Sequence, residues 1–123
     1  MIMDGLRDPL NPFEGGEVRL FGMYRRGTVL SAYDSAQYFA ALNGIASPPA
    51  TSDLEGEEAG SRSVWRSGQI EVELISIRDG GHSLPQPYQR APRILGPTAM
   101  HFDGAGEIWR FFERQPATGT IAK

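Results

Sequence analysis

The chain has 123 residues, of which 40% are hydrophobic and 22% charged, and its 12 basic and 15 acidic groups give a formal net charge of -3. This length allows one modest domain. The charge balance excludes the basic footprint of a nucleic-acid-binding protein, and no apolar run approaches the ~20 residues of a membrane helix, so we expect a soluble protein with neither kind of partner. Because the chain has no cysteine, disulfides, thiolate metal sites and a cysteine nucleophile are excluded.

The first residues, Met1 to Gly5, lack the basic and apolar regions of a signal peptide, and the cellular compartment stays open. Met1 to Met3 is interpreted as the end of a strand, with the chain start inside the element. A loop rich in glycine and proline is predicted to follow as far as Gly16. The segment Glu17 to Arg26 is ambiguous and is compatible with a short strand or a lid.

A helix is predicted from Ser31 to about Asn43, because Ser31 and Asp34 have the spacing of a capping box and Gly44 is a typical stop. The next stretch, 46–60, is rich in proline, serine, glycine and acidic residues, which predicts an exposed, linker-like loop.

Two strands are predicted around Gly68, at Ser61 to Ser67 and Gln69 to Ile77. In the second, apolar residues alternate with Glu71 and Glu73 before both faces become apolar, which is typical of a strand that starts at a sheet edge and ends buried. An exposed face explains the two glutamates better than a glycosidase pair does.

A proline-rich loop, 84–97, leads to a last helix that Asp103 can cap. Helical spacing predicts that this helix docks an apolar stripe on a core, formed by Ala105, Ile108, Trp109 and Phe112. Residues 117–123 are expected to be a frayed tail. The alternation of strands and helices predicts an α/β fold with three to four mainly parallel strands, two flanking helices and an incomplete sheet.

His82 is the main candidate for a catalytic residue. It follows the best strand of the chain in the run Asp79 to Ser83, where two glycines can lift it off the strand end as a general base. A single histidine in a turn is more often a solvated side chain, but Asp8 follows the first strand in the same way, and catalytic groups of open α/β sheets gather at the carboxyl ends of strands. If the strands are neighbours, Asp8 can accept the Nδ1 proton of His82 and stabilise the imidazolium.

Three segments resemble the polyhydroxybutyrate depolymerase-like (feruloyl esterase-like) serine esterases of the α/β-hydrolase superfamily. Asp4 to Gly16 is similar to the acid-loop motif of that family, Gly80 to Pro85 to its histidine motif, and Phe102 to Phe112 to its closing helix, in family order. The resemblance implies that Asp8 is the triad acid and His82 the triad base, acting on a small ester or a hydroxyalkanoate polyester. Leu84 stands where the family usually has tryptophan, which affects substrate contacts.

The chain contains no Gly-x-Ser-x-Gly elbow, and Ser61, Ser63 and Ser83 lie in contexts unsuited to a nucleophile. In this fold the nucleophile precedes the acid, so it is expected upstream of Met1. We therefore expect residues 1–123 to be the C-terminal part of one hydrolase domain of ~200 to 250 residues, inactive without its N-terminal half.

Two alternatives stay open: a non-catalytic small α/β binding or assembly domain, and a fragment of another α/β hydrolase, such as a dienelactone hydrolase-like enzyme or a peptidase. No cofactor or metal is expected, because His82 and His101 are isolated from any acidic ligand cluster, and His101 suits a capping or surface role. The aromatic residues are expected to pack the core more often than to line a groove; these are Tyr33, Tyr38, Trp65 and Trp109.

Overall fold

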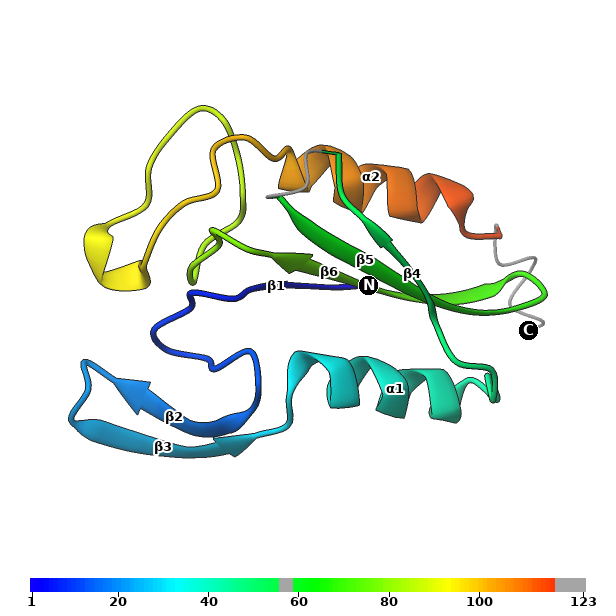
Figure 1. Ribbon diagram of the computed structural model, residues 1–123, viewed down its shortest axis with the longest axis horizontal. Coiled ribbons are helices and arrows are strands. Elements are labelled where there is room, and N and C mark those ends of the chain that lie inside the picture. The colour runs from blue at the N-terminus through cyan, green and yellow to red at the C-terminus, as the bar shows by residue number, and fades with distance from the viewer. Residues whose placement is uncertain (56–58, 117–123) are drawn as a thin grey trace, which may run out of the picture.

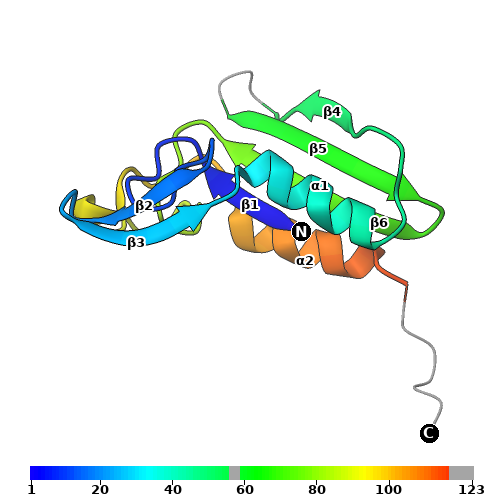
Figure 2. The same cartoon turned by 90° about the horizontal axis from the view of Figure 1, so that it is seen from below.

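The computed structural model describes residues 1–55 and 59–116. It is a small mixed α/β fold in which a four-stranded sheet has one helix on each face, and a separate two-stranded sheet projects from one end (Figures 1 and 2). In chain order the elements are β1 (Ile2–Gly5), β2 (Gly16–Leu20), β3 (Tyr24–Val29), α1 (Ala32–Leu42), β4 (Ala50–Asp53), β5 (Gly60–Ser67), β6 (Ile70–Ile77), the short 3-10 helix η1 (Arg93–Leu95) and α2 (Gly104–Arg114). Within the described ranges no helix is long and apolar enough to cross a membrane.

The large sheet has the strand order β1-β6-β5-β4 and contains one parallel pair, β1 with β6. Both β5 with β6 and β4 with β5 are antiparallel. The expectation of mainly parallel strands is therefore wrong. The cause is the two-residue turn at Gly68, whose positive φ of 59° closes a hairpin between Ser67 and Ile70, because parallel neighbours need a much longer crossover.

The segment 46–60 contains β4, so the interpretation as a linker-like loop is wrong for this part of the chain. All four residues of β4 are exposed, and the strand pairs on one side only, which explains why its sequence shows no apolar alternation. On either side of the undescribed residues 56–58, Leu54 and Ala59 are buried in the core cluster that includes Ile75 and Ile77. The predicted tail, 117–123, lies outside the described residues.

Helix α1 confirms its predicted start and end. The Ser31 hydroxyl accepts a hydrogen bond from the Asp34 amide at 2.9 Å, and the helix ends at Leu42 just before Gly44. Its buried alanines pack on one face of the sheet, against a cluster that includes Trp65 and Leu74. The ambiguous segment Glu17 to Arg26 forms strands, since it lies in the β2–β3 hairpin.

Helix α2 starts as predicted, with Asp103 accepting a hydrogen bond from the Gly106 amide at 3.0 Å. The predicted docking of its apolar stripe is wrong, because Trp109 is 66% exposed and Phe112 is 63% exposed. Phe111 is buried instead, and the helix turns charged side chains towards the sheet.

Glu73 explains this orientation. It is fully buried on the central strand β6, where α2 covers it, so the expectation that Glu71 and Glu73 form an exposed face is wrong. Arg114 on α2 donates to Glu73 Oε2 at 2.7 Å. Arg62 Nε lies 2.8 Å from Glu73 Oε1, an ion-pair distance, although its N–H does not point at the oxygen. Arg62 also pairs with Glu107 of α2.

The pKa values of the two glutamates shift in opposite directions, although burial acts to raise both. Burial raises the pKa of Glu73 above its ordinary value of 4.5, and the charges of Arg62 and Arg114 only partly oppose this. Burial also acts to raise the pKa of Glu71, but hydrogen bonds from Arg66 and Arg114 outweigh it, and that pKa is lowered.

The exposure of the two tryptophans predicts very different effects of alanine substitution. Trp65→Ala should lower the free energy of unfolding by about 3–5 kcal/mol, because it leaves a cavity in the core. Trp109→Ala should change it by less than about 0.5 kcal/mol. Urea denaturation measures both values, and equal losses would contradict the orientation of α2.

Because the pKa of Glu73 is raised on folding, the native state binds more protons than the unfolded state between the two pKa values, and this contribution to stability falls as pH rises above 4.5. Glu73→Gln cannot take up the proton. We expect the stability of the wild type relative to Glu73→Gln to decrease with rising pH, measured by urea denaturation at several pH values. If the difference in stability between the two proteins did not change with pH, the raised pKa of Glu73 would be contradicted.

Candidate functional site

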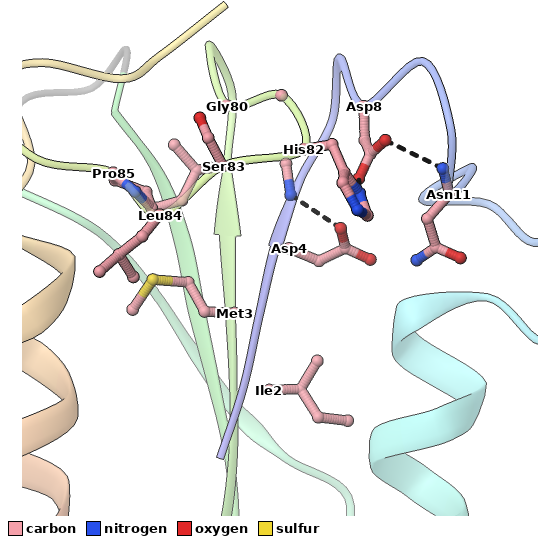
Figure 3. A pocket seen from close by; sticks show the side chains of 13 residues that line it. Ile2, Met3, Asp4, Asp8, Asn11, Gly80, His82, Ser83, Leu84 and Pro85 are labelled. Carbon is pink, nitrogen blue, oxygen red and sulfur yellow. Dashed lines mark hydrogen bonds and ion pairs between the residues drawn. The ribbon is translucent and has the colours of Figure 1, made fainter. Parts of the chain in front are cut away.

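The parallel pairing of β1 and β6 brings the predicted acid and base together. The two strands end side by side, in the register Gly5 with Ile77, and the loops that follow carry Asp8 and His82. His82 Nδ1 lies 2.7 Å from Asp8 Oδ2, as expected if the strands are neighbours. Figure 3 shows the two side chains meeting at the carboxyl end of the sheet.

The Asp8 carboxylate is fixed by its own loop. Oδ1 accepts hydrogen bonds from the backbone amides of Leu10 at 2.8 Å and Asn11 at 2.9 Å, which leaves Oδ2 for the imidazole. The Asp8 side chain is 4% exposed, whereas that of His82 is 49% exposed. With Asp8 ionised, Nδ1 of His82 carries the proton, and Nε2 is the nitrogen that can accept one.

The backbone at His82 is also hydrogen-bonded to the segment that contains Leu95 and Pro97. The His82 amide donates to the Leu95 carbonyl at 2.6 Å, and the Gly81 amide donates to the Pro97 carbonyl at 2.7 Å. The proline-rich segment after the histidine therefore folds back over its own start. These backbone hydrogen bonds restrain the main chain at His82. The restraint matters because the half-exposed imidazole is held by few side-chain contacts of its own.

The glycines at the site allow the two loops to touch. A Cβ atom on Gly5 would lie 2.2 Å from the Gly80 carbonyl oxygen, and one on Gly81 would lie 2.4 Å from the Leu95 carbonyl oxygen. In the same contact, the Arg7 amide donates to the Gly80 carbonyl at 2.9 Å. The glycines before His82 thus permit close backbone approach, in addition to lifting the histidine off the strand.

A pocket of about 430 Å³ lies beside the Asp8–His82 pair. Its apolar wall includes Ile2, Met3, Leu84 and Pro85, while Asp4, Asn11 and Ser83 contribute polar groups (Figure 3). The position at which this chain has leucine and the resembling family has tryptophan, Leu84, is therefore part of the wall.

Asp4 is a site residue that the sequence analysis did not single out. It lines the pocket from β1, and its Oδ1 accepts the Gly5 amide at 2.9 Å. Burial raises the pKa of Asp4 and the nearby charge of Asp8 adds to this, while the Gly5 hydrogen bond and His82 oppose it. The available signal was periodicity, because Asp4 shares a strand face with the apolar Ile2, where a carboxylate is unusual.

The remaining candidates lie outside the pair. His101 is exposed and lines no part of the pocket, and Ser61 and Ser63 belong to β5. Ser83 lines the pocket, but its hydroxyl faces Thr98 at 3.5 Å, and no hydrogen bond joins His82 to a serine among the described residues. In the same part of the chain, no group of three His, Asp or Glu side chains is arranged to hold a metal ion.

Comparison of the chain with protein-family models, with curated proteins and with solved structures found no match. The likeness to serine esterases therefore depends on the three motifs of this sequence. What the geometry provides is an oriented carboxylate–imidazole pair beside a partly apolar pocket, an arrangement that can remove a proton from a group placed at Nε2.

Gly5→Ala is predicted to break the site, since its Cβ would collide with backbone. We expect a loss of about 1–3 kcal/mol in the free energy of unfolding and loss of the deshielded Nδ1 proton resonance of His82 in NMR spectra. Gly44→Ala is the control: its φ is +71°, but no atom lies within 4 Å of the added Cβ. It should cost stability and leave the His82 resonance in place. Survival of that resonance in Gly5→Ala would contradict the role of the glycine contact.

Proposed function

We propose that Asp8 and His82 are the acid and base of a serine carboxylic-ester hydrolase, of the polyhydroxybutyrate depolymerase-like type within the α/β-hydrolase superfamily. The observation that carries this proposal is the 2.7 Å contact between His82 Nδ1 and Asp8 Oδ2, at the carboxyl ends of adjacent parallel strands. The order and content of the three family-like motifs support it. The nucleophile belongs to a polypeptide segment outside residues 1–123.

In the proposed reaction, His82 Nε2 takes the proton of a serine hydroxyl as its oxygen attacks the ester carbonyl, and Asp8 stabilises the resulting imidazolium. The imidazolium then gives this proton to the departing alcohol, leaving an acyl-enzyme. Water attacks the acyl group with His82 again as base, which releases the acid and regenerates the serine. The donors that stabilise the oxyanion come with the nucleophile.

The pocket suits a small ester or a unit of a hydroxyalkanoate polyester. Its volume of about 430 Å³ and its apolar wall at Met3 and Leu84 match a short acyl chain. The Asp4 carboxylate faces the same space and offers an acceptor to a substrate hydroxyl group. No cofactor takes part in this chemistry.

The edge of β1 that faces away from β6 supports the proposal that the active enzyme contains a further polypeptide segment beside this strand. Among the described residues, β1 pairs only with β6 in the four-stranded sheet, so its second side has no strand partner there. Such an edge is a template for a further strand. A parallel strand added there would end at the same end of the sheet as β1 and β6, where Asp8 and His82 meet, and could carry the nucleophile.

The first test is the chain alone with p-nitrophenyl acyl esters. We expect no turnover beyond that of the His82→Ala variant, because no serine among the described residues is hydrogen-bonded to His82, whose side-chain partner is Asp8. If the isolated chain hydrolysed the ester and His82→Ala abolished this turnover, the proposal that the nucleophile lies outside residues 1–123 would be contradicted.

The second test uses a longer polypeptide encoded in the same reading frame and containing a Gly-x-Ser-x-Gly segment before Asp8. We expect ester hydrolysis, with kcat lowered about 10⁴-fold or more by either His82→Ala or Asp8→Ala. His101→Ala is the matched control and should retain activity. A longer polypeptide that folds but hydrolyses no ester would favour the alternative of a small binding or assembly domain.

A further inference from the structure

The β2–β3 hairpin has an apolar tip that is exposed to solvent. Phe21 is 56% exposed, Met23 77% and Tyr24 59%. All six residues of β3 are exposed, and neither strand contributes to the buried core clusters. The hairpin projects beyond the end of the large sheet at which β1 and β6 terminate, the end that carries the pocket (Figures 1 and 2). Two-stranded sheets of this kind gain little stability by themselves in water.

The turn places the bulky ring of Phe21 where the backbone least favours a large side chain. The Met23 amide donates to the Leu20 carbonyl at 3.3 Å, and the two residues between them both have positive φ, 55° for Phe21 and 71° for Gly22. Asn, Asp and Gly dominate such positions, and a bulky residue there is strained. Phe21 is the only non-glycine residue with positive φ in the described part of the chain. Phe21 is 56% exposed and belongs to neither core cluster, so packing among the described residues offsets little of this strain.

The hairpin is basic although the chain as a whole is acidic. Residues 16–29 contain three arginines and one glutamate, whereas the chain has a formal charge of -3. Glu17 pairs with Arg19 at 2.8 Å and with Arg25 at 3.0 Å. Arg26 makes no ion pair within the described ranges. Because Arg25 and Arg26 directly follow Tyr24, the positive charge lies just behind the apolar tip.

We infer that this tip is a peripheral anchor for an anionic lipid surface. Phe21 and Met23 enter the boundary of the acyl chains, Tyr24 lies at headgroup level, and Arg25 and Arg26 bind lipid phosphates. An uncharged polyester surface would accept the apolar tip but leave the arginines unmatched. The expectation of no membrane partner came from the lack of a spanning segment, which such an anchor does not need. The anchor would hold the pocket-bearing end of the sheet towards the membrane.

Flotation of the full chain with vesicles tests this inference. We expect binding to phosphatidylcholine vesicles that contain phosphatidylserine, and weaker binding to vesicles of phosphatidylcholine alone. Phe21→Asn should reduce binding roughly tenfold by removing the buried ring. Because asparagine suits the left-handed backbone, this variant should melt no earlier than the wild type, which separates lost binding from lost folding. Phe112→Asn removes a ring of similar exposure, 63%, from α2 and should bind as the wild type does.

A second pair of variants tests the contribution of the hairpin arginines to lipid binding. Arg26→Gln should weaken binding about fivefold on vesicles with phosphatidylserine, while Arg90→Gln, an exposed arginine outside the hairpin, should not. Equal binding to the two kinds of vesicle, an unchanged Phe21→Asn variant or an equal loss in Phe112→Asn would each overturn the inference. Binding to a polyhydroxybutyrate film but not to vesicles would also overturn it and assign the tip to a polymer surface.

Discussion

The contact between the backbones of Gly5 and Gly80 is the constraint on which the site depends. With any side chain at Gly5, the end of β1 and the turn after β6 could not come this close, and the loops that carry Asp8 and His82 would separate. The backbone hydrogen bonds across this contact, from Leu6 to Ile77 and from Arg7 to Gly80, continue the parallel ladder past the ends of the strands. The distance between Asp8 and His82 is therefore set by the packing of main chain against main chain.

The local features were predictable because each depends on neighbours in the sequence. The Ser31 and Asp103 caps and the strand that ends at Ile77 follow from spacing and from the glycines. The approach of Asp8 to His82 was predictable only on the condition that their strands are neighbours, because the two residues lie 74 positions apart. The orientation of α2 was not predictable in this way. Its apolar stripe satisfies helical periodicity, but Glu73 on the central strand requires cationic partners, and the position of Glu73 in the sheet depends on pairings that no local pattern contains.

The two faces of the large sheet are covered by different kinds of side chain. Under α1, small alanines allow the helix to lie close to Trp65 and Leu74 in an apolar layer. Under α2, Arg114 bridges helix and sheet through Glu73. A buried ion pair of this kind contributes little net stability compared with apolar packing, but separating its members is costly. The ion pairs between α2 and the sheet therefore determine which side of the helix faces inward. They contribute less to the stability of its packing.

The β1–β6 pairing also has a consequence for the order of folding. Strands β4, β5 and β6 are consecutive along the chain and can pair through short connections, whereas Ile2 pairs with Leu74 only after most of the chain between them has been closed into a loop. Loop closure of this kind costs entropy before the contact is gained, so β1 is expected to join the sheet late. Asp8 and His82 then meet only after β4, β5 and β6 have paired, and the proposed acid–base pair is absent from partly folded chains in which β1 has not joined the sheet.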